Sequence, residues 1–313
     1  MTELRIAIIG FGRIAQRRHV AAIGATSGLT LVAVADPNAD AADAGVPLFP
    51  GLRELLRDGP VIDAVALCTP PQIRTAQAAL ALAAGKHVLL EKPPGKSICE
   101  IAPLLAAAQG SSRTLFTAWH SRFAPAVEPA RQLLAGRRIA SVSIVWKEDV
   151  RVWHPGQAWI FEPGGLGVFD PGINALSILT HILQRPVLVT RADLDVPSNC
   201  AAPIAAELEL ADATGLLITA AFDFRQTGEQ SWDIHFETDA GPVLLTRGGA
   251  CLSDSGKTIL DATKDEEYPM LYRRFVQLAA EGRSDVDLAP FQLVADCFML
   301  GRWRTVEAFE DQA

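Results

Sequence analysis

The sequence lacks the features of a nucleic-acid-binding or membrane protein. Its 28 Lys and Arg residues are outnumbered by 36 Asp and Glu residues, which gives a net charge of −8. No basic tract gathers the positive charges into a surface that could follow a phosphate backbone. Charge, glycine or proline interrupts every uncharged stretch within about 18 residues, so no segment is expected to span a bilayer. We therefore expect neither nucleic acid nor a membrane as a partner.

Cysteine is also scarce. Five cysteines are scattered along the chain without a C-x-x-C pair, which argues against a disulfide framework and a thiolate zinc site. No set of His, Asp and Glu residues has a familiar metal-ligand spacing, so no metal is expected. The chain starts Met1-Thr2-Glu3-Leu4-Arg5, without the apolar run of a secretory signal. Reduced thiols and the missing signal predict a cytoplasmic protein.

From residue 4 to about residue 136, short apolar runs alternate with amphipathic segments rich in Ala and Leu. The apolar runs predict strands at Leu4–Ile9, Leu29–Ala35, Ala64–Cys68, His87–Leu90 and Thr114–Ala118. The amphipathic segments predict helices at Ile14–Gly24, Leu52–Leu56, Ile73–Ala84 and Ile98–Ala108. Because the strands are almost continuously apolar, we expect both faces of their sheet to be buried. This repetition predicts an α/β fold with a doubly wound parallel sheet, that is, a Rossmann domain.

Beyond about residue 140, apolar residues recur at every second position, as in residues 206–210 and 232–236. This period predicts an α+β domain with an open antiparallel sheet. Further helices are predicted at Asn174–Leu183, Pro269–Glu281 and Pro290–Glu307. We predict a dinucleotide-binding domain over residues 1–122 and a substrate-binding and oligomerisation domain over residues 123–313. Whether the last helix packs back on the first domain stays open, and the open sheet face offers a surface for a homodimer.

A glycine-rich turn follows the first predicted strand. The run Gly10-Phe11-Gly12-Arg13-Ile14-Ala15 matches the pattern G-x-G-x-x-A. Gly10 permits the tight turn, Gly12 lets the backbone approach a pyrophosphate, and Ala15 allows helix and strand to pack closely. The free N–H groups at the start of the helix then face the phosphates. We therefore predict that this turn binds a dinucleotide and is not merely a structural glycine turn.

Asp36, at the end of the second predicted strand, bears on the choice of cofactor. It lies 24 positions after Gly12, near the spacing expected for a carboxylate that binds the adenosine ribose. A carboxylate accepts hydrogen bonds from a 2′-hydroxyl but repels a 2′-phosphate, and the following Pro37 and Asn38 supply no positive charge. We therefore predict NAD as the preferred cofactor, while the use of NADP stays open.

Three further motifs, together with the glycine-rich turn, resemble the Gfo/Idh/MocA oxidoreductases. They are Thr69-Pro70 after the strand ending at Cys68, Glu91-Lys92-Pro93 after the next strand, and Gly164–Asn174, which reads GGLGVFDPGIN. The resemblance implies that Thr69, Pro70, Glu91 and Lys92 border the cofactor. It also implies that Lys92 and Asp170 line the active site.

One position departs from the family's pattern. The family commonly has histidine where this chain has Asn174, and an asparagine side chain cannot act as a base near neutral pH. Asn174, Trp119-His120 and Trp153–Gln157 resemble the branch of the family that oxidises sugars at C1. That branch implies L-arabinose as the first expected substrate and D-galactose as a close second.

Aromatic and polar residues gather between residues 146 and 174, a stretch that holds three of the six tryptophans. Sugars present apolar C–H faces and polar hydroxyl edges, which suit aromatic rings combined with carboxylates and amides. Trp153 is expected to face the ligand more readily than Trp146, which begins inside a strand-like run. The expected substrate-binding residues are Lys92, His120, Glu148, Trp153, Asp170, Asn174 and Trp232. The alternative is that these tryptophans only fill the interface between domains.

The resemblance implies oxidation of an aldopyranose at C1 to the lactone, with hydride transfer to C4 of the nicotinamide. Asp170 is the expected base, and Lys92 is expected to donate a hydrogen bond to the same oxygen; the reverse assignment stays open. Asn174 is expected to orient the substrate. An inositol or polyol dehydrogenase and a non-catalytic sensor of NAD or sugar are the alternatives. His19, His87 and His181 have no partner motif and are expected to be structural or solvent-facing.

Overall fold

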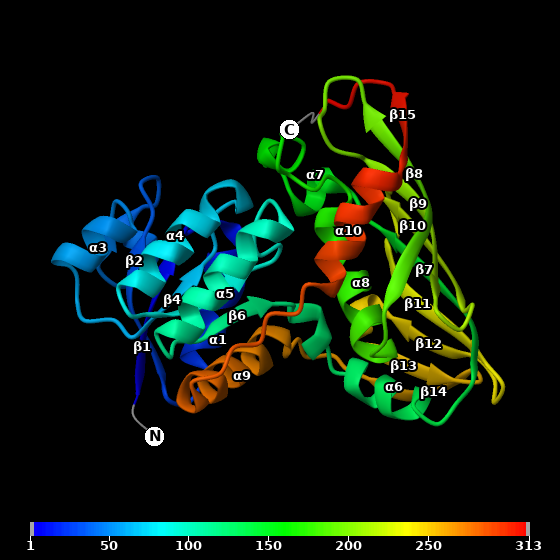
Figure 1. Cartoon of the computed structure of the whole chain (residues 1–313), viewed down its shortest axis with the longest axis horizontal. Helices are drawn as coiled ribbons and strands as arrows, with labels where there is room; N and C mark the ends of the chain where they lie inside the picture. Colours follow the sequence, from blue (N-terminus) through cyan, green and yellow to red (C-terminus); the bar gives the residue numbers. More distant parts are fainter. Residues whose placement is uncertain (1–2, 311–313) are drawn as a thin grey trace. The chain divides into compact units, whose positions relative to one another are not determined.

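The computed structural model describes residues 3–310 (Figure 1). Met1 and Thr2, part of the start of the chain where no secretory signal is expected, lie outside the described residues. The chain forms two compact units. The first comprises Met1–Trp119 and Tyr268–Asp287, and the second comprises His120–Glu267 and Leu288–Ala313. The first unit is therefore built from two separate stretches of sequence. The expected domains, residues 1–122 and 123–313, instead place Tyr268–Asp287 in the second domain. Whether these domains fold independently stays a prediction.

The first unit contains a six-stranded parallel sheet in the order β3-β2-β1-β4-β5-β6, which confirms the predicted doubly wound fold. Its strands are β1 (Leu4–Ile9), β2 (Leu29–Ala35), β3 (Leu48–Phe49), β4 (Ala64–Leu67), β5 (His87–Glu91) and β6 (Leu115–Ala118). Its helices are η1 (Ala15–His19), α1 (Val20–Gly24), α2 (Ala41–Ala44), α3 (Leu52–Asp58), α4 (Pro71–Ala83), η2 (Ile98–Glu100), α5 (Ile101–Gly110) and nearly all of α9 (Glu267–Glu281). Every residue of β4 and β5 is buried, because helices cover both faces of the sheet.

The helix predicted at Ile14–Gly24 differs from a regular α-helix in its first turn. Residues Ala15–His19 form a π-helical turn, η1, and α1 continues from Val20. The last residue of η1, His19, is buried. Gly10, just before this turn, has a φ of +86°, and a Cβ atom there would lie 2.8 Å from the backbone nitrogen of Thr69. The turn between β1 and η1 therefore requires glycine at position 10.

The second unit contains a nine-stranded sheet in the order β14-β13-β12-β11-β7-β10-β9-β8-β15. Its strands are β7 (Ile139–Lys147), β8 (Val187–Pro197), β9 (Ala205–Asp212), β10 (Leu217–Asp223), β11 (Ser231–Thr238), β12 (Val243–Thr246), β13 (Cys251–Asp254), β14 (Lys257–Asp261) and β15 (Arg302–Val306). Its helices are η3 (His120–Phe123), α6 (Val127–Leu134), α7 (Val150–Trp153), η4 (Ala158–Ile160), α8 (Phe169–Leu183), η5 (Arg247–Gly249) and α10 (Ala289–Leu300). Most neighbouring strands are antiparallel, but β10 pairs with β7 and β15 with β8 in parallel, so the sheet is mixed.

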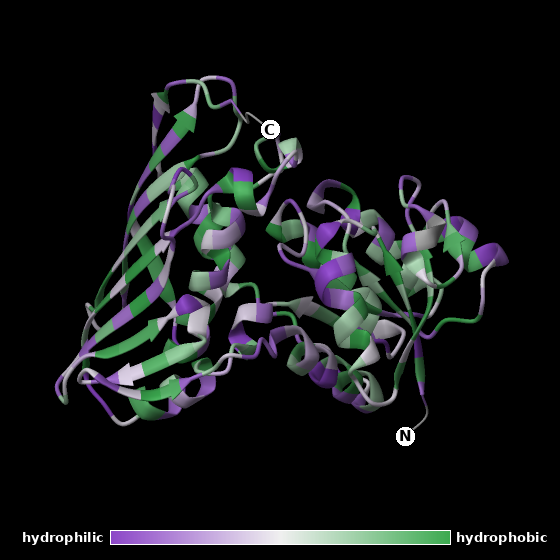
Figure 2. Ribbon diagram, turned by 180° about the vertical axis from the view of Figure 1, so that it is seen from behind, coloured by the Kyte–Doolittle hydropathy of each residue, from purple (hydrophilic) through white to green (hydrophobic). Residues whose placement is uncertain are grey.

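The predicted alternation of apolar and polar residues is present in this sheet. In β9 the apolar Ala206, Leu208 and Leu210 are buried, while Glu207 and Glu209 point the other way. Figure 2 shows the resulting bands of hydrophilic and hydrophobic residues along the strands. The helices α6, α8 and α10 lie on one face of the sheet in Figure 1. Among residues 3–310, no helix is both long enough and apolar enough to cross a bilayer.

The prediction of one helix from Pro290 to Glu307 is wrong in its second half. Helix α10 ends at Leu300, Gly301 is extended, and β15 then pairs in parallel with β8. A Cβ atom on Gly301 would lie 2.3 Å from the carbonyl oxygen of Cys297, so only glycine fits this close turn. The aromatic and β-branched residues that follow favour a strand, and pairing with β8 outweighs the helical spacing of the apolar residues.

Candidate active site

The glycine-rich turn of the first unit is tied to the end of β2 through Asp36. Asp36 Oδ2 accepts the backbone N–H of Phe11 at 2.7 Å, and Oδ1 accepts the backbone N–H of Asn38 at 2.8 Å. The backbone N–H of Gly10 donates to the carbonyl oxygen of Ala35 at 2.9 Å. Each carboxylate oxygen of Asp36 can accept a further hydrogen bond. The half-buried Asp36 can therefore bind a ribose hydroxyl while it holds the turn in place.

The turn itself fits a dinucleotide. A Cβ atom on Gly12 would meet no atom within 4 Å, so the backbone at this position is open to a pyrophosphate. Arg13 and Ile14, the next two predicted cofactor residues, precede η1, and the side chain of Ile14 is exposed. The amide of Gln16 donates to the carbonyl oxygen of Phe11 at 3.0 Å and closes the turn from the other side. The open backbone at Gly12 therefore fits a pyrophosphate, while the roles of the individual residues stay predictions.

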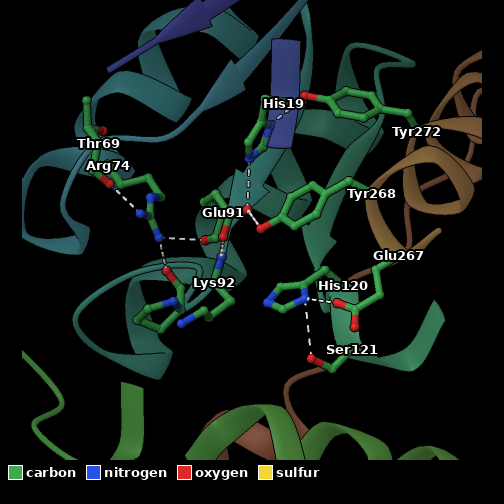
Figure 3. Close-up of polar contacts among 11 residues, drawn as sticks. His19, Thr69, Arg74, Glu91, Lys92, His120, Ser121, Glu267, Tyr268 and Tyr272 are labelled. Carbon is green, nitrogen blue, oxygen red and sulfur yellow. Dashed lines mark hydrogen bonds and ion pairs between the residues drawn. The ribbon is translucent and has the colours of Figure 1, made fainter. Parts of the chain in front are cut away.

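The Glu91-Lys92-Pro93 segment is held at the end of β5 by a buried arginine. The guanidinium of Arg74, in α4, donates to the backbone carbonyl oxygens of Glu91, Thr69 and Pro93 (Figure 3). These three carbonyl groups belong to the ends of two neighbouring strands and to the loop that follows β5. Lys92 is half-buried and follows directly after β5. Arg74 therefore fixes the main chain on both sides of the predicted catalytic lysine.

His19, expected to be structural or solvent-facing, is buried and has several buried partners. Its Nε2 lies 3.0 Å from Glu91 Oε1, and its Nδ1 lies 2.7 Å from the hydroxyl of Tyr272. The hydroxyl of Tyr268 donates to the same Glu91 oxygen at 2.7 Å. Sequence reasoning missed this group because Tyr268 and Tyr272 lie far along the chain. The only signal in the sequence is the position of Glu91 next to Lys92.

In the second unit, two carboxylates lie beside the imidazole of His154. Its Nε2 lies 3.7 Å from Glu148 Oε1 and 3.7 Å from Asp170 Oδ2. Glu148 follows β7 directly, His154 follows α7, and Asp170 lies in the first turn of α8. Glu148 and Asp170 are 6% and 3% exposed, so both carboxylates are buried beside one imidazole. The imidazole of His154 therefore lies close to both buried carboxylates.

Two tryptophans border this group. The indole N–H of Trp232, in β11, donates to Glu148 Oε2 at 2.8 Å, and the indole N–H of Trp153 donates to Gln230 Oε1 at 2.5 Å. The two rings meet edge to face with centroids 5.5 Å apart. Trp153 is 43% exposed, whereas Trp146 is 4% exposed within β7. The second unit thus combines an accessible aromatic surface with buried carboxylates, which is the composition that sugar binding requires.

Asn174 and His120 are the other predicted substrate residues of this unit. Asn174 lies one helical turn after Asp170, so the two side chains project from the same side of α8. His120 opens η3, and its Nδ1 lies 2.5 Å from Glu267 Oε2 and 3.3 Å from Ser121 Oγ. Glu267 therefore orients the imidazole of His120, a partner that the sequence did not indicate. Within residues 3–310, no group of three or more His, Cys, Asp or Glu side chains is arranged to hold a metal ion.

The parallel sheet, the glycine-rich turn and Asp36 define an NAD(P)-binding oxidoreductase unit, and comparison with known proteins agrees. Residues 4–118 match a family model described as an oxidoreductase family with an NAD-binding Rossmann fold. The chain belongs to this family, Gfo/Idh/MocA, which confirms the predicted family and cofactor class.

Two full-length relatives support the assignment. The chain is 47% identical to galactose 1-dehydrogenase from Pseudomonas fluorescens, over 99% of this chain and 100% of that protein. It is 51% identical to D-galactose-1-dehydrogenase from Rhizobium etli, whose crystal structure matches with a TM-score of 0.93 over 99% of each chain. A 3-ketoreductase from Actinomadura kijaniata shares the fold, with a TM-score of 0.83 at 20% identity over 99% of this chain and 100% of that one.

Proposed function

We propose that the protein is an NAD(P)-dependent aldose 1-dehydrogenase, which oxidises an aldopyranose at C1 to the lactone. The observation that carries this proposal is the group of Glu148, His154 and Asp170 beside two tryptophans in the second unit. The two full-length relatives named galactose 1-dehydrogenases support the same chemistry.

The reaction removes a hydride and a proton from one sugar carbon and its hydroxyl group. NAD(P)⁺ supplies the hydride acceptor, so the C1–H electron pair leaves the sugar and the C1–O bond becomes a carbonyl. The O1 proton must leave in the same reaction. A carboxylate is a suitable acceptor for it, and a cation that donates a hydrogen bond to O1 stabilises the negative charge that develops there.

We assign the proton to Asp170 and the hydrogen bond to Lys92. Asp170 is buried, so water competes little for its oxygens, and its Oδ2 lies 3.7 Å from Nε2 of His154. Lys92 follows a main chain that Arg74 holds rigidly, which suits a group that must be placed accurately. Asn174 has no basic nitrogen and takes the role of orienting the substrate.

The substrate that we propose is a sugar with the configuration shared by L-arabinose and D-galactose at C2, C3 and C4. Glu148, Trp153 and Trp232 would read the hydroxyl edge and the apolar face of such a sugar. The two sugars differ at C5, where galactose carries an additional hydroxymethyl group. The names of the relatives favour D-galactose. L-arabinose is the second proposed substrate, and comparing the two sugars shows whether the pocket has room for the hydroxymethyl group on C5.

The cofactor that we propose as preferred is NAD, because Asp36 would repel a 2′-phosphate. A homodimer through the open sheet face and a cytoplasmic location also remain proposals. Sedimentation velocity of the purified protein would test the first of these.

The deciding experiment is a substrate panel. Pure protein is mixed with NAD or NADP and with L-arabinose, D-galactose, D-glucose or myo-inositol, and NADH or NADPH is followed by absorbance. Reduction with arabinose or galactose is the expected result. Reduction with inositol alone would favour a polyol dehydrogenase, and tight NAD binding without turnover would favour a sensor. Either of these results would overturn the proposal.

A further inference from the structure

A buried polar network lies in the first unit next to Lys92 (Figure 3). It is formed by His19, Glu91, Tyr268 and Tyr272, which are between 0% and 4% exposed. His19 ends the π-helical turn that follows the glycine-rich turn, Glu91 ends β5, and the tyrosines lie one helical turn apart in α9. The network therefore joins three elements that are distant in the sequence.

Glu91 is the centre of this network. Its Oε1 receives the hydroxyl proton of Tyr268 at 2.7 Å and lies 3.0 Å from Nε2 of His19. Its Oε2 accepts the backbone N–H of Lys92 at 2.8 Å. The carboxylate thus bridges the buried imidazole and the main chain of the predicted catalytic lysine.

The charges in the network balance. Burial on its own would lower the pKa of His19, but interactions with Cys68 and Glu91 raise it to about 10. The raised pKa favours the charged imidazolium, whose Nε2 donates to the Glu91 carboxylate. An imidazolium and a carboxylate in contact form a buried ion pair, which is rigid but contributes little to stability compared with an apolar pair of the same size.

The His19–Glu91 pair can hold the main chain at Lys92 in one position. Arg74 holds the carbonyl oxygens of Glu91 and Pro93, and the Glu91 carboxylate holds the N–H of Lys92. The Glu91–Lys92 peptide group before the lysine side chain, and the Pro93 carbonyl that follows one residue later, are therefore bound to buried charged groups. Because His19 ends η1, the turn that follows the glycine-rich turn, the same pair also ties that part of the chain to Lys92.

We propose that the His19–Glu91 ion pair is a positioning device, which sets the reactive lysine relative to the dinucleotide turn. Neither side chain takes part in the reaction, and both act through the backbone of Lys92. The proposal rests on the proposed function in so far as Lys92 is the group that contacts the substrate.

The test replaces Glu91 by glutamine, which keeps the shape and removes the charge. We expect Glu91→Gln to lower kcat by about 10- to 100-fold, because small misplacements of a reacting group have effects of this size. The dissociation constant for NAD is measured in parallel, and a loss in kcat that exceeds the loss in NAD affinity is the expected result of a misplaced lysine. Glu281→Gln, which changes an exposed glutamate of α9, is the matched control and should leave both quantities unchanged.

A second readout does not depend on turnover. The rate at which acetic anhydride acetylates Lys92, relative to the exposed Lys96, is measured by mass spectrometry in the folded protein. We expect Glu91→Gln to change this ratio several-fold. If the wild-type protein oxidises no sugar but the ratio changes, the proposed function fails while the positioning role stands.

The double variant His19→Gln/Glu91→Gln completes the test. If the two side chains act as one pair, the double variant loses no more activity than either single variant. Should Glu91→Gln fail to fold, Tyr268→Phe removes one hydroxyl donor to Glu91 and keeps the ion pair, and a smaller change in the same direction is expected. A folded Glu91→Gln or Tyr268→Phe variant with the wild-type kcat and labelling ratio would overturn the inference.

Discussion

At the scale of single residues, the proposed chemistry depends on Lys92 and Asp170. Replacing either by alanine removes a group that handles the O1 proton or the charge on O1. We expect Lys92→Ala and Asp170→Ala each to lower kcat by about a hundredfold or more. Asn174→Ala should cost less, because orientation alone is lost. Steady-state kinetics with the best sugar of the panel provides the measurement, and near-wild-type turnover of either alanine variant at the first two positions would refute the mechanism.

The cofactor preference is also a property of single residues. The carboxylate of Asp36 accepts two backbone N–H groups and keeps capacity for a ribose hydroxyl. We expect Asp36→Ser combined with Asn38→Arg to move the ratio of kcat/KM values toward NADP, because repulsion is lost and a cation is gained. The ratio is measured with both cofactors at a saturating sugar concentration. A double variant that keeps the wild-type ratio would show that Asp36 does not set the preference.

At the scale of secondary-structure elements, η1, β5 and α9 share one protonated histidine. Interactions with Cys68 and Glu91 overcome the effect of burial and raise the pKa of His19 from 6.5 to about 10, and Tyr268 and Tyr272 complete its surroundings. The folded protein therefore holds a proton that the unfolded chain releases near pH 6.5. This stabilisation is fully present below pH 6.5 and is lost as the pH rises through 10.

We therefore expect the free energy of unfolding to fall between pH 7 and pH 9.5, by about 1.4 kcal/mol per pH unit for one proton. His19→Gln should flatten this slope, whereas His235→Gln, which changes an exposed histidine, should keep it. Urea titrations at several pH values give the slopes. Equal slopes in the wild type and in His19→Gln would contradict the assigned protonation.

The junction between α10 and β15 depends on a single glycine. A Cβ atom on Gly301 would lie 2.3 Å from the carbonyl oxygen of Cys297 and 3.0 Å from Leu194. We expect Gly301→Ala to destabilise the protein by about 1–3 kcal/mol, because the chain must shift to avoid the backbone. Gly24→Ala is the control, since a Cβ atom there would meet nothing within 4 Å and the change should be neutral or stabilising. Thermal unfolding compares the two variants, and an unchanged melting temperature for Gly301→Ala would show that the junction tolerates a side chain.

At the scale of the whole molecule, the first unit requires a segment from the far end of the sequence. Helix α9 buries Leu271, Tyr272 and Phe275, and Phe275 stacks on Phe116 of β6 with ring centroids 6.2 Å apart. We therefore expect residues 1–122 on their own to melt at a lower temperature than the same residues joined to 267–287 by a flexible linker. Circular dichroism on heating tests this. Equal melting temperatures would support residues 1–122 as an independent domain.

The distance along the chain between contacting residues explains which features could be predicted from the sequence. G-x-G-x-x-A and Glu91-Lys92-Pro93 are local patterns at the ends of strands, so the parallel sheet and the placement of Lys92 next to β5 could be predicted. The partners of His19 could not, because Tyr272 lies 253 positions away and no local period links the two. The end of α10 was missed for a similar reason, since pairing of β15 with β8 outweighs the helical spacing around it.

Helix α9 also has a consequence for synthesis on the ribosome. The strands of the first unit have all been synthesised once the ribosome has passed residue 118. The hydroxyl groups that contact His19 and Glu91, however, belong to Tyr268 and Tyr272. At typical elongation rates the nascent chain waits roughly 10–30 s for them. During this interval a charged carboxylate and an imidazole lie in an unfinished core, so truncated polypeptides that stop before α9 should be substrates for chaperones and proteases.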